Sequence, residues 1–158
     1  MMPQPIVGEI VPEFTVLSAA GEYVRASDYR GRRNLILIFC GTGRSAVVRA
    51  LVRQVSELYA EFAAEEAQAL AVVQGAGDEA EDLDRSCNPP FPILLDKDGH
   101  AHELFGCRSS EQHSFPIACV VDRFGELRHI CGAAESQSSG FARDILEWVR
   151  DVNLECPE

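Results

Sequence analysis

The residues that could carry chemistry gather where a buried strand meets a helix, in the stretch LILIFCGTGRSAVVRALV at 35–52. Apolar residues 35–39 run into a glycine-containing turn, and an amphipathic pattern begins at Ser45. Cys40 ends the strand, and Arg44 precedes the helix. A helix start and a neighbouring cation both stabilise a thiolate. The sequence therefore offers Cys40 as a nucleophile, with an inert buried thiol at a strand end as the alternative.

The same turn is similar to the end of a phosphate-binding P-loop, because it lies between a strand and a helix. However, Ile38 stands where that motif requires its first glycine, and Arg44 replaces its lysine. A β-branched side chain keeps the backbone from wrapping phosphates, which argues against nucleotide hydrolysis. A small anion held by the helix start, Arg44 and Ser45 stays open as an alternative.

The histidines and the remaining cysteines form no chemical constellation in the sequence. His100 and His102 lie in a polar segment that predicts a solvated turn, with a metal site as the less favoured alternative. His113 could approach Ser45 as a serine–histidine pair, but no aspartate partner is visible. The cysteines are at positions 40, 87, 107, 119, 131 and 156, and none pair at C-x-x-C spacing. We therefore expect no metal and no cofactor.

The composition is that of a globular protein with an acidic excess. The chain has 158 residues, of which 46% are hydrophobic and 25% charged, and its net charge is −11. This length suffices for one domain with a buried core. The negative charge argues against nucleic acid and anionic membrane surfaces as partners. No signal-peptide pattern opens the chain, and no segment nears the roughly 20 apolar residues that span a bilayer, so we expect a cytoplasmic protein.

Hydropathy periodicity predicts strands that alternate with helices. The predicted strands are 14–17, 23–25, 35–39, 69–73, the end of 88–96, 117–121 and 127–131. The predicted helices are 46–65, 78–86, 101–105 and 140–152. In the first helix, steps of three and four place Val47, Val48 and Leu51 on one apolar face. This order of elements predicts an α/β fold, a mixed central β-sheet with helices on both faces.

Long segments of the chain follow the motifs of a known family. Residues 7–39 contain Gly8, Pro12 and Phe14 of the pattern G-x-x-x-P-x-F-x-L, with Val16 at its last position, and then a Gly-x-x-Val turn and Tyr-Arg-Gly before the buried strand. Residues 91–106 contain F-P-x-L-x-D-x-x-G, and 115–127 contain a Pro-x-x-x-hydrophobic-x-Asp-x-x-Gly hairpin. In this order the motifs resemble the alkyl hydroperoxide reductase/thiol-specific antioxidant family, which includes the peroxiredoxins.

The resemblance implies a thioredoxin-like fold and a single domain over residues 1–158. Within it we expect an N-terminal β pair at 14–25, a core at 35–152 and a short tail at 153–158. The family resemblance also implies a thiol-dependent redox or antioxidant role and allows a homodimer.

The family's nucleophile position is altered in this chain. Alignment on Phe39 puts Gly41, Ser45 and Val48 at the Pro, Thr/Ser and peroxidatic Cys of the peroxiredoxin motif P-x-x-x-[T/S]-x-x-C. It puts Arg44, Ser45 and Val48 at the Trp and the two Cys of the thioredoxin motif W-C-x-x-C. Reduction of a peroxide needs a thiolate that attacks the O–O bond. Valine has no ionisable group and cannot do this.

A second family position is altered at the start of the last hairpin. Peroxiredoxins carry an arginine there, whereas this chain has Pro116, as thioredoxin-like relatives do. The resemblance predicts a cis Phe115–Pro116 bond, with a plain trans turn as the alternative. It also implies a partner-binding surface formed by Gly43, Arg44, Ser45, Phe115 and Pro116.

Two functional hypotheses follow. In the first, the chain is a thiol-redox protein that uses Cys40 as a displaced thiol and a thiol reductant as its electron source. In the second, it is a catalytically silent thioredoxin-fold module that binds a protein, peptide or small-molecule partner at the surface from Ser45 to Pro116.

Overall fold

A seven-stranded sheet forms the centre of the protein, in the order β2-β1-β5-β4-β3-β6-β7. The computed structural model describes residues 6–75, 77–107, 116–132 and 140–155. Strands β3, β4 and β5 are parallel, and β1, β2, β6 and β7 add antiparallel neighbours. The strands are β1 Thr15–Ser18, β2 Tyr23–Arg25, β3 Asn34–Phe39, β4 Ala67–Gln74, β5 Ile93–Asp96, β6 Ile117–Val121 and β7 Leu127–Gly132.

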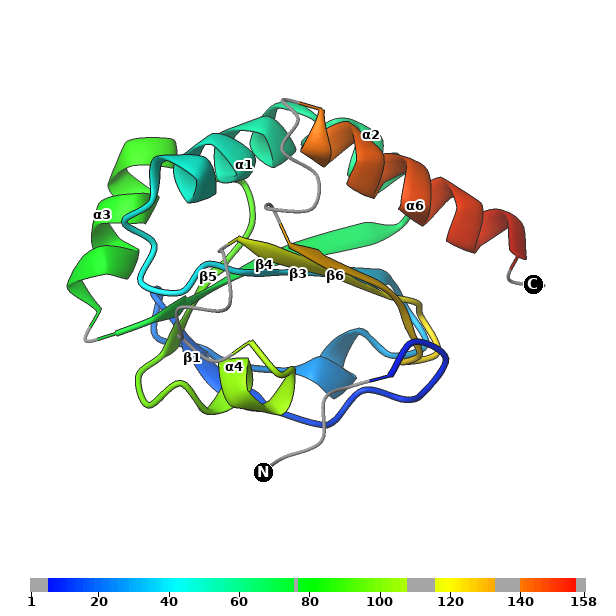
Figure 1. The fold of residues 1–158 in the computed structure, drawn as a ribbon, viewed down its shortest axis with the longest axis horizontal. Helices are drawn as coiled ribbons and strands as arrows, with labels where there is room; N and C mark the ends of the chain where they lie inside the picture. The colour runs from blue at the N-terminus through cyan, green and yellow to red at the C-terminus, as the bar shows by residue number, and fades with distance from the viewer. Residues whose placement is uncertain (1–5, 76, 108–115, 133–139, 156–158) are drawn as a thin grey trace.

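Helices cover both faces of this sheet, as the sequence predicts. The helices are α1 Ala46–Glu57, α2 Tyr59–Ala64, α3 Asp78–Cys87, α4 His100–Leu104 and α6 Phe141–Glu155, with a short 3-10 helix η1 Ala26–Tyr29. Figure 1 shows α1, α2, α3 and α6 above the sheet, and α4 with the N-terminal part of the chain below it. None of the helices in the described ranges is long and apolar enough to span a bilayer.

Three details differ from the sequence predictions. The predicted helix 46–65 is interrupted at Leu58, whose φ and ψ of −94° and 6° end α1 before α2 begins. Val47, expected on the apolar face, is 53% exposed because the buried face of α1 is formed by Val48, Leu51, Val52 and Val55, and Val47 lies at the edge of that face. Helix α6 continues to Glu155 and so includes half of the predicted tail.

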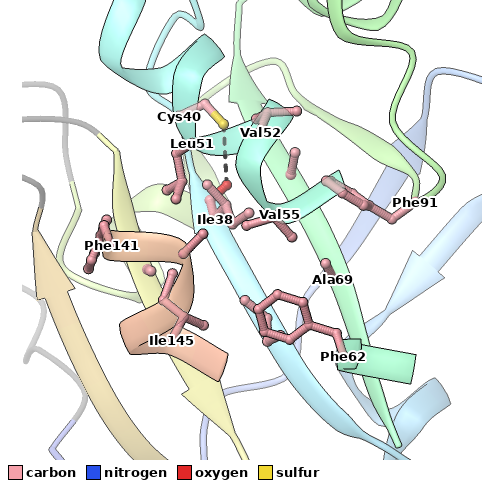
Figure 2. Packing of buried hydrophobic residues seen from close by; sticks show 14 of the residues in the cluster. Ile38, Cys40, Leu51, Val52, Val55, Phe62, Ala69, Phe91, Phe141 and Ile145 are labelled. Atoms are coloured by element: carbon pink, nitrogen blue, oxygen red, sulfur yellow. Dashed lines mark hydrogen bonds between the residues drawn. The ribbon is translucent and has the colours of Figure 1, made fainter. Parts of the chain in front are cut away.

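The alternation of β3 divides the core into two layers. All six residues of β3 are buried, and successive side chains point to opposite faces of the sheet. Ile36, Ile38 and the following Cys40 pack under the helices above the sheet (Figure 2), while Leu37 and Phe39 pack on the α4 side. Because both faces of β3 are buried, its sequence from Leu35 to Phe39 is a continuous apolar run.

The carboxyl ends of the parallel strands create the edge where the candidate site lies. Phe39 at the end of β3 is paired with Val72, and Gln74 at the end of β4 is paired with Asp96 at the end of β5. The chain leaves this edge in three loops, toward α1, α3 and α4. Parallel strands place such loops together, and ligand sites of open α/β sheets often lie there.

Candidate functional site

The loop from β3 to α1 is a tight turn fixed to the neighbouring strand. The Cys40 N–H donates to the Val72 carbonyl (2.9 Å), and the Gln74 N–H donates to the Gly41 carbonyl (2.6 Å). The Gly43 N–H donates to the Cys40 carbonyl at 3.0 Å, which closes the turn. Gly41 and Gly43 have φ angles of +58° and +76°, a region in which glycine carries no steric cost. The glycines predicted between strand and helix are therefore required by this backbone path.

Ser45 serves here as the cap of a helix. It has extended backbone angles, and its hydroxyl accepts a hydrogen bond from the Val47 N–H at 3.1 Å. A capping serine satisfies one of the N–H groups that the first turn of a helix leaves unpaired. The position that aligns with the family's Thr/Ser thus fixes where α1 begins.

Arg44 is exposed and forms an ion pair with the first turn of α3. Its guanidinium donates to Glu79 Oε1 at 2.7 Å, and 75% of its side chain is accessible to solvent. Hydrogen bonds from the backbone N–H of Glu79 and from Arg44 lower the pKa of this carboxyl group. The Glu79 carboxylate therefore already pairs with Arg44. It would compete with a small anion bound at this helix start, the alternative that the sequence analysis left open.

Val48 and Cys40 lie inside the apolar layer above the sheet. Val48 is fully buried, and Cys40 is 2% exposed. Both belong to one cluster with Leu51 and Val52 of α1. The Cys40 thiol donates to the Ile38 carbonyl at 3.4 Å, toward the interior (Figure 2). Neither the family's nucleophile position nor the nearest thiol in sequence faces solvent.

The sequence predicts a stabilised thiolate at Cys40, but in the structure the pKa of this thiol is raised. Burial, with a smaller contribution from nearby Cys87, raises the pKa of the Cys40 thiol to about 12, although a backbone hydrogen bond at Val72 lowers it in part. A helix start lowers a thiol pKa only when the thiol remains solvated or faces the helix dipole directly. Cys40 lies beneath the first turns of α1 among aliphatic groups, so loss of solvation outweighs the dipole.

Pro116 lies next to the loop. It is buried and precedes Ile117, which is paired with Phe39 at the end of β3, so Pro116 lies beside Cys40 across the sheet. Gly43 is buried as well, so that among the described members of the predicted binding set Arg44 and Ser45 are exposed. Phe115, the isomer of its bond to Pro116, and His113 lie outside the described residues.

A buried acid–histidine pair, which the sequence did not predict, lies below the same loop. His102 is fully buried, and Asp96 is 3% exposed. His102 Nδ1 lies 2.7 Å from Asp96 Oδ2, and the Gly41 N–H donates to His102 Nε2 at 3.1 Å. Asp96 also accepts the N–H groups of Ala101 (3.0 Å) and His102 (2.9 Å). The pair connects the end of β5 to the β3–α1 loop.

The prediction of a solvated turn was wrong for His102 and fits only its neighbour His100. His100 is exposed and donates its N–H to Asp98 at 3.0 Å. Its position two residues earlier on a short helix puts it on the opposite side from His102. The available signal was Asp96, a carboxylate at the end of a buried strand six residues before a histidine. Within the described residues, no three His, Cys, Asp or Glu side chains are arranged to hold a metal ion.

Burial and hydrogen bonding act in opposite directions on Asp96. Burial by itself raises the pKa of this carboxyl group, but hydrogen bonds from the His102 ring and from the backbone N–H groups of His102 and Ala101 lower it overall. Asp96 is therefore ionised at neutral pH and accepts the proton of His102 Nδ1 as a hydrogen bond. This arrangement holds the β3–α1 loop from below.

A family model described as the AhpC/TSA family matches residues 7–130, well over half of the chain. The chain belongs to the AhpC/TSA family. The family recognised from the sequence motifs is therefore confirmed, and so is the thioredoxin-like fold. The AhpC/TSA chain is 27% identical to alkyl hydroperoxide reductase E of Mycobacterium tuberculosis and of Mycobacterium bovis over 146 residues, which cover 90% of this chain and 92% of each relative.

Solved structures agree with the fold of this AhpC/TSA protein. The peroxidoxin BcpB from Mycobacterium tuberculosis has a TM-score of 0.80 at 17% identity, covering 94% of this chain and 99% of its own. A putative thiol:disulfide interchange protein DsbE from Chlorobium tepidum has a TM-score of 0.75 at 19% identity, covering 92% and 99%. Similar structures thus include both peroxidase-type and disulfide-exchange-type names, and the AhpC/TSA family to which the chain belongs is a redox family.

The chemistry available at this AhpC/TSA site is limited by what faces solvent. The exposed groups at the start of α1 are the Arg44 guanidinium, the Ser45 hydroxyl and the Val47 side chain. The first is paired and the second caps a helix. None of these groups is a thiolate, which peroxide reduction requires.

Proposed function

We propose that this AhpC/TSA protein is catalytically silent at the family's nucleophile position and acts as a binding module for a protein partner. One observation carries the proposal. The family's thiolate position holds Val48, which is fully buried, and the nearest thiol, Cys40, is buried with its pKa raised to about 12. A thiol with such a pKa is almost entirely protonated at neutral pH and is a poor nucleophile.

The start of α1 supports a binding role. Val47 is 53% exposed beside Ser45 and the charged side chain of Arg44. An apolar side chain exposed within a polar rim is the kind of group that anchors an interface. The partner would cover the surface from Ser45 toward Pro116, with Val47 as the apolar contact.

Oxidation of the reduced protein tests catalytic silence. One equivalent of hydrogen peroxide is added, and intact mass spectrometry with peptide mapping follows each cysteine over time. We expect slow oxidation spread over several cysteines, with the same rates in the Cys40→Ser and Cys119→Ser variants. Rapid modification of Cys40 alone, lost in Cys40→Ser and kept in Cys119→Ser, would overturn the proposal, because Cys119 is an equally buried thiol.

Site-specific photo-crosslinking in cells tests the binding surface. A photoreactive phenylalanine analogue replaces Val47, and a matched control replaces Glu57, an exposed residue at the other end of α1. We expect one defined crosslinked species from position 47, absent from position 57 and weakened by Arg44→Glu. Equal crosslinking at both positions, or none at either, would contradict a partner site at the start of α1.

A second candidate keeps the redox role of the family, and the position of Cys87 favours it. Cys87 is half-buried at the end of α3, contacts the cluster that contains Cys40, and affects the Cys40 pKa. In this candidate the Cys40 thiolate attacks the peroxide O–O bond, the alcohol or water leaves, and Cys40 becomes a sulfenic acid. The Cys87 thiol then condenses with it, water is released, and a thiol reductant restores both thiols.

The peroxide experiment separates the two candidates. A disulfide between Cys40 and Cys87, mapped after peroxide and removed by dithiothreitol, would support the redox candidate. We further propose a cytoplasmic location, where thiols stay reduced, in keeping with free Cys40, Cys87, Cys107, Cys119 and Cys131 in the described residues. Self-association into a homodimer is testable by sedimentation velocity over a concentration series.

A further inference from the structure

We propose that His102 is a protonation-controlled latch that holds the β3–α1 loop closed through Gly41. The consequence for binding rests on the proposed function, because the loop leads into the surface from Ser45 to Pro116. The latch itself is a property of the free protein and is tested without a partner.

The hydrogen bonds fix the protonation state of the His102 ring. Asp96 Oδ2 is ionised and accepts, so His102 Nδ1 carries the ring proton in their 2.7 Å contact. His102 Nε2 accepts the Gly41 N–H at 3.1 Å, so this nitrogen carries no proton. The closed loop therefore requires neutral imidazole, with one nitrogen as donor and the other as acceptor.

Protonation removes the acceptor on which the loop depends. A proton on His102 Nε2 would point at the N–H of Gly41, and two donors would face each other at hydrogen-bond distance. The protonated ring keeps its Nδ1 hydrogen bond to Asp96. The Gly41 N–H must then find another acceptor, and within this buried site that requires the loop to move. Gly41 and Gly43 give the loop the backbone freedom to do so.

Among the described residues, one charged group and one aromatic ring are in contact with the His102 ring. Facing His102 are Asp96 from β5 and the ring of Phe39 from β3, whose centroid lies 5.1 Å away. The side chains of β4 on this face are apolar, apart from the amides of Gln68 and Gln74. Titratable groups in the same layer among the described residues are the thiols of Cys107 and Cys119 and the phenol of Tyr29, and burial raises the pKa of all three. These groups remain neutral over the range in which histidine titrates.

The remaining charged groups near α4 lie on its outer side. His100 is exposed and Glu103 is partly exposed, two residues before and one residue after His102. Lys97 and Asp98 are exposed in the loop that precedes α4. Solvent screens these exposed charges, whereas the contact between Asp96 and the His102 ring is buried.

Hydrogen exchange at Gly41 tests the latch directly. The protection factor of the Gly41 amide, corrected for the intrinsic rate at each pH, is measured from about pH 8 to about pH 5, where histidines change charge. In wild type we expect it to fall about tenfold or more as pH decreases, as for loss of one buried hydrogen bond. His102→Gln offers an amide donor and acceptor that cannot titrate, so its protection should not change. His100→Gln is the matched control and should behave as wild type.

A second measurement distinguishes local opening from unfolding. Cys40 precedes Gly41, whereas Cys119 lies in β6, and both thiols are buried. With a disulfide reagent that reacts across this pH range, Cys40 should label faster at low pH in wild type, while Cys119 stays protected. Parallel labelling of both thiols would mean global unfolding and would overturn the latch. The same pH response in His102→Gln and wild type, or no response in wild type, would also overturn it.

Discussion

The β3–α1 junction and the β5–α4 junction meet at one edge of the sheet, but they differ in chemical character. Above the sheet, where AhpC/TSA chemistry needs a thiolate, Val48 and Cys40 are buried among aliphatic side chains. Below the sheet, where the sequence suggested only a polar turn, Asp96 and His102 form a buried, hydrogen-bonded pair. The Gly41 N–H, which His102 accepts, connects the two regions.

The contrast places the buried polar groups of this sheet edge at the β5–α4 junction and not around Val48, the predicted nucleophile position. Burial suppresses the ionisation of Cys40, while hydrogen bonds preserve the ionisation of Asp96. Both groups are almost completely buried, so burial alone does not decide whether a group keeps its charge. The number of hydrogen bonds that the charged form receives decides it.

Removal of Asp96 should have the largest effect. Asp96→Ala leaves the His102 ring and two backbone N–H groups without their buried acceptor, so we expect a loss of about 3 kcal/mol or more in the free energy of unfolding. Urea denaturation measures it. Asp98→Ala, at an exposed position nearby, should change stability by less than about 1 kcal/mol. Equal losses in both variants would contradict a special role for the buried pair.

Lowering the pH should weaken the hydrogen bonds of the Asp96–His102 pair before it affects the apolar layer above the sheet. The Asp96 pKa is lower in the folded state than in the unfolded chain, so its contribution is present above the unfolded pKa of about 3.9 and is lost as pH falls through the folded pKa. Stability should therefore decrease more steeply below about pH 4 in wild type than in Asp96→Asn. Urea midpoints between pH 5 and pH 3 measure the two slopes, and parallel slopes would argue against this assignment.

Reintroduction of the family thiol should have a small effect. Val48→Cys replaces one fully buried apolar side chain by another of similar size, so we expect stability to change by less than about 1.5 kcal/mol. The new thiol should not reduce peroxide, because burial disfavours its thiolate and Pro116 stands in place of the family's arginine. Peroxide consumption and cysteine mapping test this. Rapid oxidation of the new thiol would mean that the loop opens readily.

Loss of the exposed ion pair should have the smallest effect. Arg44→Ala removes the contact with Glu79, but the arginine side chain is mostly solvated, and such pairs contribute little. Thermal unfolding should show no measurable shift in the midpoint. A clear decrease would indicate that the link between the β3–α1 loop and α3 is structurally important, and Arg53→Ala, elsewhere on α1, controls for loss of surface charge.

Most elements of the fold were predictable because their signals are local. The strands at 23–25 and 117–121 have the predicted bounds, and the buried run at 35–39 differs by one residue from β3. Ser45 was predictable as a helix start from its residue type and position. The inward orientation expected of Val47 was wrong, because steps of three and four predict a helix face but not where the edge of its buried part lies.

The order of strands and helices, the family, and the absence of a thiol at position 48 follow from the sequence, because they depend on residue types at fixed spacings. The burial of Cys40 and the meeting of Asp96 and His102 beneath Gly41 follow from the packed structure. Ionisation depends on solvent exposure and on hydrogen-bond partners from other elements, and these exist only once the sheet and its helices have packed.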